Sequence, residues 1–208
     1  MTIEEIRGAW ARSRAALEPS TDALFHMGIL EHWRGLPAGD PRLDTLTAEL
    51  VAADVAVTPT LHLFAQRVGR TTFESEPAGP FEDSRGWNAA QRAMGAAGYD
   101  RMAAFVASLH RAGVRLATGS DSEDPGRAIL SEMLLLHSAG IPMADVLRIA
   151  SLGSARIAGI EADHGSIEVG KSADFVLLDD DPFLNPTALE GPRTVFRSGV
   201  QWRDCASP

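Results

Sequence analysis

The sequence has a single cysteine, Cys205, among its 208 residues. One cysteine excludes an intramolecular disulfide and a cysteine-rich metal site, so any metal ion must be bound by histidine and carboxylate side chains. The chain also lacks a run of about 18 apolar residues, and its first residues have neither the basic nor the apolar region of a signal peptide. We therefore expect a cytoplasmic protein with no membrane contact.

Basic residues are also scarce, because 19 lysines and arginines face 28 aspartates and glutamates and give a formal net charge of -9. A surface of this sign does not attract a phosphate backbone or an acidic lipid, so nucleic acid and membrane are not expected as partners. The 45% of hydrophobic and 23% of charged residues are typical of a soluble protein with a packed core. A small molecule is the expected partner.

The hydrophobic pattern of the first 160 residues predicts an α/β fold in which helices alternate with short strands. Such an order favours parallel pairing, because the crossovers are long. Asp40 is a candidate N-cap, and the irregular stretch 69–90 is either a lid over a site or a disordered segment. Expected helices span 2–17, 43–54, 99–112, 127–139 and 142–158, and expected strands span 22–28, 54–61 and 114–118.

From residue 165 the pattern changes to short β segments joined by turns, which predicts a small sheet beside the α/β part. The segments are 165–172, 173–178 and 194–202. The expected domains are therefore 1–160 and 161–208.

Asp121 is the first candidate for chemistry. The short apolar run 114–118 ends in Gly119-Ser120-Asp121, which places the acid at the carboxyl end of a predicted parallel strand. Catalytic groups gather at that rim in α/β folds, and a carboxylate there can bind a metal or accept a proton. The alternative is that Asp121 only caps a turn or the helix that follows. His26 ends the predicted strand 22–28 and is either a metal ligand or a buried structural histidine.

Three segments resemble the metal-dependent amidohydrolase superfamily, in particular its imidazolonepropionase-like and Xaa-Pro-dipeptidase-like members. They are Ala-Gly-Val-Arg-Leu-Ala-Thr-Gly-Ser-Asp at 112–121, Val-Leu-Arg-Ile-Ala-Ser-Leu-Gly-Ser-Ala-Arg-Ile-Ala-Gly at 146–159, and Gly-Ser-Ile-Glu-Val-Gly-Lys-Ser-Ala-Asp at 165–174. The last string is highly specific.

This resemblance implies a partial (β/α)8 TIM barrel, namely its last three strands and their helices, followed by strands of a small β-sandwich domain. It also implies a divalent metal, with zinc expected, that activates a water molecule for attack on a carbon-nitrogen bond. In that reading Asp121 is both metal ligand and base, and His26 is a further ligand.

The sequence departs from the family pattern in one respect, because it contains no His-x-His motif. Only two of the expected metal ligands are found, whereas a catalytic zinc site needs three protein ligands. We therefore expect a truncated chain. Two functions follow: a hydrolase of non-peptide or dipeptide-like amide bonds, or a non-catalytic fragment that forms a homo-oligomer through exposed sheet edges.

Three further residues are candidate substrate contacts. Thr60 and His62 follow the predicted strand 54–61, and Glu123 follows Asp121. The alternatives are that His62 is a partly exposed loop histidine and that Glu123 is simply solvated. The acidic run 179–181 lacks the spacing of a calcium loop, and no Gly-x-Ser-x-Gly elbow supports a serine hydrolase.

Overall fold

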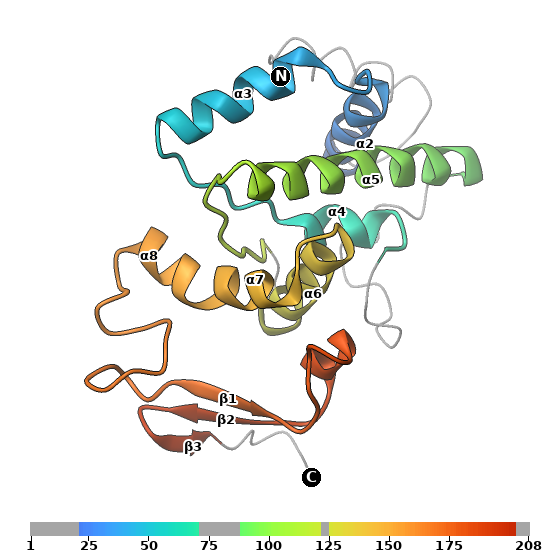
Figure 1. The fold of residues 1–208 in the computed structure, drawn as a ribbon. Helices are drawn as coiled ribbons and strands as arrows, with labels where there is room; N and C mark the ends of the chain where they lie inside the picture. The colour runs from blue at the N-terminus through green and yellow to red at the C-terminus, as the bar shows by residue number, and fades with distance from the viewer. Residues whose placement is uncertain (1–20, 71–87, 122–124, 203–208) are drawn as a thin grey trace.

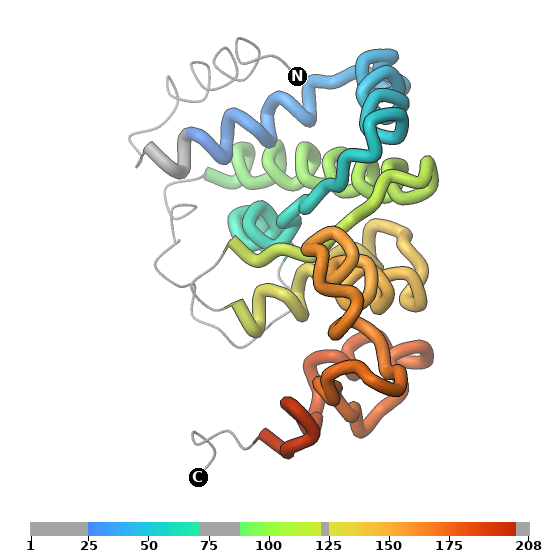
Figure 2. The backbone as a smooth tube through the Cα atoms, turned by 90° about the vertical axis from the view of Figure 1, so that its left-hand side faces the viewer, coloured from blue at the N-terminus to red at the C-terminus, as the bar shows by residue number. Residues whose placement is uncertain are grey.

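A computed structural model describes residues 21–70, 88–121 and 125–202 of the chain. Figure 1 shows a body of helices with a small sheet at its lower end. The side view in Figure 2 places the strands at the opposite end of the molecule from the first described helices. The expected helix 2–17 and most of the irregular stretch 69–90 lie outside the described residues.

The predicted strand 22–28 is wrong, because these residues belong to helix α2 (Thr21–Gly35). A short apolar run fits either a strand or a buried helix, and neighbouring structure decides between them. Here the apolar side chains of Met27 and Leu30, three positions apart, are both buried. They pack toward α5 (Ala89–Arg111), which runs beside α2.

The two helices approach each other closely at Gly98 of α5. A Cβ atom built on Gly98 would lie 2.0 Å from the backbone oxygen of Leu30. About one helical turn further along α5, the Arg101 side chain donates a hydrogen bond to the backbone oxygen of Leu36, the residue that follows α2. Absence of a side chain at position 98 therefore sets the distance between α2 and α5.

The other predicted helices are confirmed with shifted ends. Helix α3 (Pro41–Ala52) begins after Asp40, whose side chain accepts a hydrogen bond from the backbone N–H of Arg42 at 3.0 Å. Hydrogen bonds from Arg42 lower the pKa of Asp40 to about 2. Helix α5 starts ten residues before the predicted helix 99–112, because Asn88 and Gln91 form a capping box there.

The predicted parallel pairing of 54–61 with 114–118 is confirmed at one bridge, between Val57 and Leu116. Val57 donates its backbone N–H to Arg115 O at 2.9 Å, and Ala117 donates to Val57 O at 3.0 Å. Among the described residues the predicted three-stranded parallel sheet is therefore reduced to this pair. Helix α4 (Leu61–Arg67) follows the first member of the pair directly.

The region after Asp121 is helical. Helix α6 (Pro125–Ser138) corresponds to the predicted helix 127–139. The predicted helix 142–158 is divided into α7 (Met143–Arg148), a π-helical turn η2 (Ile149–Gly153) and α8 (Ser154–Ala158). Within the described ranges, no helix has both the length and the apolar character needed to cross a membrane.

The small sheet is antiparallel with the order β1-β2-β3. Its strands are β1 (Phe175–Leu178), β2 (Arg193–Arg197) and β3 (Val200–Trp202), whereas residues 165–172 form turns and not the predicted strand. Phe175 pairs with Phe196, and their rings stack with centroids 4.5 Å apart. The 3-10 helix η3 (Pro186–Glu190) packs against α6 and joins the sheet region to the helices.

Substitution of Gly98 by alanine tests the close contact between α2 and α5. The added methyl group would overlap the Leu30 backbone oxygen, so the helices must separate, and we expect a loss of about 2 kcal/mol in the free energy of unfolding measured in urea. Gly35→Ala is the matched control, because no atom lies within 4 Å of its added Cβ. Equal stability of the two variants would contradict the contact.

Candidate functional site

Asp121 follows the segment that pairs with Val57, and its side chain is exposed. Its backbone is in the left-handed region, with φ at 42°. Non-glycine residues seldom adopt this conformation, although aspartate tolerates it better than most, and such residues are frequent at functional sites. Asp121 thus lies in irregular backbone just beyond the parallel pair, at the place that the sequence predicted. We call residues 119–121 the Asp121 turn.

The turn rests on one side against the residues that precede α4. A Cβ atom on Gly119 would lie 2.4 Å from Thr58 Cγ2 and 3.0 Å from Thr60 Cγ2. Only glycine therefore fits between these two methyl groups. Thr60 also has left-handed backbone geometry, with φ at 48°, and is half-buried. The candidate substrate residue Thr60 consequently lies beside the turn that carries Asp121.

On its other side the segment is held by Ser154. The Ser154 hydroxyl accepts a hydrogen bond from the backbone N–H of Thr118 at 3.3 Å and donates one to Ile149 O at 2.7 Å. The π-helical turn η2 lies between Ile149 and Ser154, and such turns are frequently found at functional sites. The segment before Asp121 is therefore fixed from both flanks.

Glu132 is a buried residue of α6 that the sequence reasoning missed. Its side chain is fully buried, and Oε2 accepts the backbone N–H of His62 at 2.7 Å. Within the described residues Oε1 has no hydrogen-bond partner. Burial raises the pKa of Glu132 to about 7, and the backbone hydrogen bonds from His62 and Leu61 partly oppose this rise. One signal was available, namely an acid in the middle of an apolar helical run.

His62 belongs to the first turn of α4 and is 5% exposed, so the alternative of a partly exposed loop histidine is wrong. Its ring Nε2 meets the side-chain Nε2 of Gln66, one turn later. Tyr99 of α5 is also buried. Burial is the main cause that raises the pKa of Tyr99, and the charge of Glu132 is the second. A role for His62 in substrate binding stays a prediction.

His26 lies in α2 and not at the end of a strand, which removes the geometric reason for choosing it as a ligand. Its side chain is 4% exposed, and its ring makes edge contacts with Phe25 and Phe64 at centroid distances of 5.5 and 5.4 Å. Its role as a metal ligand stays a prediction, and Glu123 lies outside the described residues. Across the described part of the chain, no three His, Cys, Asp or Glu residues are grouped so that they could hold a metal ion.

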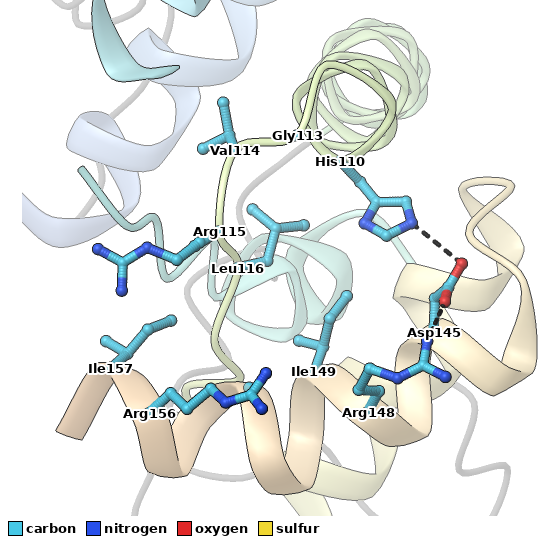
Figure 3. A pocket seen from close by; sticks show the side chains of 11 residues that line it. His110, Gly113, Val114, Arg115, Leu116, Asp145, Arg148, Ile149, Arg156 and Ile157 are labelled. Carbon is cyan, nitrogen blue, oxygen red and sulfur yellow. Dashed lines mark hydrogen bonds and ion pairs between the residues drawn. The ribbon is translucent and has the colours of Figure 1, made fainter. Parts of the chain in front are cut away.

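A separate pocket of about 290 Å³ is lined in part by residues 113–116. Asp121 lies five residues after this segment and does not line the pocket. Figure 3 shows Asp145 between the His110 ring and the Arg148 guanidinium group of this pocket. Asp145 accepts a hydrogen bond from Arg148 at 2.6 Å and lies 3.3 Å from the His110 ring nitrogen. Since none of the predicted site residues lines this pocket, we assign it no part in the chemistry of Asp121.

Replacement of Glu132 by glutamine tests the buried acid through the pH dependence of stability. Because burial raises the pKa of Glu132 from its ordinary 4.5 to about 7 in the folded chain, its ionisation favours the unfolded chain. Its stabilising contribution is complete below pH 4.5 and is lost as pH rises through about 7. Between these limits the wild type should lose up to about 3 kcal/mol more unfolding free energy than Glu132→Gln.

Urea unfolding at a series of pH values measures this difference. Ser131→Ala is the matched control, because Ser131 is equally buried on the same helix and carries no ionisable group. The control should retain the wild-type pH dependence. Parallel stability curves for the wild type and Glu132→Gln would show that Glu132 does not titrate in this range.

Residues 80–201 match the amidohydrolase family. The chain is 40% identical over 78 residues to an imidazolonepropionase of Pseudomonas aeruginosa, an alignment that covers 36% of this chain and 19% of that enzyme.

Two solved structures share the fold. A Xaa-Pro dipeptidase with bound methionine superposes with a TM-score of 0.59 at 18% identity, covering 76% of this chain and 37% of that one. A putative prolidase from Bifidobacterium longum gives a TM-score of 0.56 at 30% identity, covering 71% and 35%. The chain thus matches little more than a third of the length of these relatives. Their fold implies a TIM barrel, and the matched residues show that the chain belongs to the amidohydrolase family.

Proposed function

We propose that the protein hydrolyses a carbon-nitrogen bond of a small molecule and that Asp121 transfers the proton in this reaction. Family membership supports the reaction class, and relatives named imidazolonepropionase and Xaa-Pro dipeptidase support a small, amide-like substrate. The single observation that carries the proposal is the exposed carboxylate of Asp121, on left-handed backbone just after the parallel pair.

The chemistry requires a group that accepts one proton and later returns it. As water attacks the carbonyl carbon, the Asp121 carboxylate accepts a proton from the water oxygen, and a carbon-oxygen bond forms. The same proton then passes to the leaving nitrogen as the carbon-nitrogen bond breaks. An exposed carboxylate can reach both water and substrate, and the flanking contacts of Gly119 and Thr118 keep its turn in one place.

A divalent metal, with zinc expected, is part of the proposal, but the described residues do not form a complete site for it. Asp121 and His26 are the proposed ligands, and a catalytic zinc ion needs three from the protein. No group of three suitable side chains occurs within the described ranges. The proton transfer above is therefore assigned to Asp121 without a step through the metal.

The substrate is proposed to lie beside the Asp121 turn. Thr60 is placed there by its contact with Gly119, which makes it the best supported of the three candidate substrate residues. His62 and Glu123 remain proposed substrate contacts. His62 is the second residue of α4 and follows Thr60 by two positions. The His62 ring is buried. An indirect effect of His62 on substrate binding, through the backbone of α4, therefore fits its surroundings better than direct contact of the ring with substrate.

A second candidate function is association without catalysis. It is favoured by the large apolar side chains that the small sheet exposes, since Val176, Val200 and Trp202 are 50%, 69% and 61% exposed. Exposed apolar strands invite pairing with another copy of the chain. In this case the chain would form a homo-oligomer and bind no metal.

Asp121→Asn tests the first function in the full 208-residue chain supplied with zinc. Hydrolysis of a Xaa-Pro dipeptide and of imidazolone propionate should fall by about 100-fold or more, because asparagine cannot accept the proton. Asp180→Asn is the matched control, since Asp180 is an exposed aspartate of the turn after β1. Both variants should keep the wild-type melting temperature.

Three measurements separate the candidates: product formation, bound zinc by elemental analysis, and mass by light scattering. Equal rates for Asp121→Asn and the wild type would contradict the role of Asp121. A stable oligomer that neither binds zinc nor forms product would favour association.

A further inference from the structure

Glu132 combines three properties that a structural role in a core does not explain. It is an acid, it is fully buried, and it sits in the middle of α6 among apolar residues. Burial of a carboxyl group is unfavourable unless hydrogen bonds compensate it, and an apolar residue of similar size would usually give a more stable core. The contacts of Glu132 therefore indicate what it does.

The first contact is with the start of α4. The first N–H groups of a helix lack partners within the helix and are usually satisfied by the side chain of the N-cap residue. Thr60 occupies that position, but its side chain makes no capping hydrogen bond. Instead Glu132, 70 residues away in sequence, accepts the N–H of His62 at 2.7 Å and also interacts with the N–H of Leu61. Glu132 thus acts as the cap of α4.

The second step leads from α4 to the Asp121 turn. Thr60 is the residue immediately before α4, so the cap that fixes Leu61 and His62 also fixes Thr60. The Thr60 methyl group lies against Gly119, at 3.0 Å from the place of a Cβ atom. Gly119 is two residues before Asp121. A chain of direct contacts therefore runs from the Glu132 carboxylate through Thr60 to the turn.

We infer that Glu132 is a positioning residue that sets the orientation of the Asp121 turn by capping α4. It touches neither substrate nor Asp121, and it acts through Thr60 and Gly119. Its importance for catalysis rests on the proposed function, whereas its effect on the turn does not. Ionisable side chains with buried atoms on the elements packed against α6 are His62 and Arg67 of α4, Tyr99 of α5 and Glu190 of η3.

The test compares Glu132→Ala, Glu132→Gln and the control Ser131→Ala in the full chain by NMR. Alanine removes the cap, so hydrogen exchange of the His62 amide should accelerate by about tenfold or more, and the amide signals of Gly119, Ser120 and Asp121 should shift. Glutamine retains an acceptor oxygen, so it should keep the protection of His62. Ser131→Ala should leave all these signals unchanged, because within the described residues the Ser131 hydroxyl has no hydrogen-bond partner.

Titration distinguishes positioning from general support of the fold. In the wild type the side-chain carboxyl carbon signal of Glu132 and the Gly119 amide signal should shift with one midpoint near pH 7. In Glu132→Gln the shift of Gly119 should disappear. This comparison requires only the glutamine variant, so it applies even if the alanine variant does not fold.

Activity adds the catalytic consequence. On the proposed substrates kcat/KM should fall by about tenfold in Glu132→Ala and recover in Glu132→Gln to within about threefold of the wild type. If the Gly119 and Asp121 signals respond to neither variant nor to pH, the inference is overturned. If they respond but the wild type forms no product, the inference stands and the proposed function fails.

Discussion

The parallel bridge between Val57 and Leu116 is the constraint on which the rest of the described structure depends. Its two backbone hydrogen bonds join a segment that precedes α4 to a segment that precedes α6. Residues 59 positions apart in sequence are thereby fixed side by side, and the segments that follow them come into contact at Gly119. The bridge thus determines that Thr60 and Asp121 share one end of the fold.

The local sequence predicted this end well, because its signals are local. Glycine after a short apolar run marks the end of a strand-like segment, and Asp121 follows it as predicted. Asp40 has a side chain suited to an N-cap, and it caps α3. The antiparallel strands of the small sheet were also found close to their predicted places, although residues 165–172 form turns.

Features that depend on distant contacts were not predicted. Residues 22–28 fit a strand as well as a helix, and packing against α5, unseen in the local pattern, decides for the helix. An acid within the apolar run of α6 marks Glu132 as unusual, but its role depends on the N–H of His62, 70 residues earlier, which the local pattern does not show. The same holds for the π-helical turn, whose effect appears only when the Ser154 hydroxyl meets Thr118.

The Ser154 hydroxyl also affects how copies of the chain could associate. An exposed strand edge recruits other strands through its vacant backbone N–H and C=O groups. At Thr118 the N–H is already occupied by Ser154, so a neighbouring strand would have to displace a side chain that is anchored to Ile149. In the proposed association, a further strand would therefore add more readily to the outer strands β1 and β3 of the small sheet, which would leave Asp121 open to solvent.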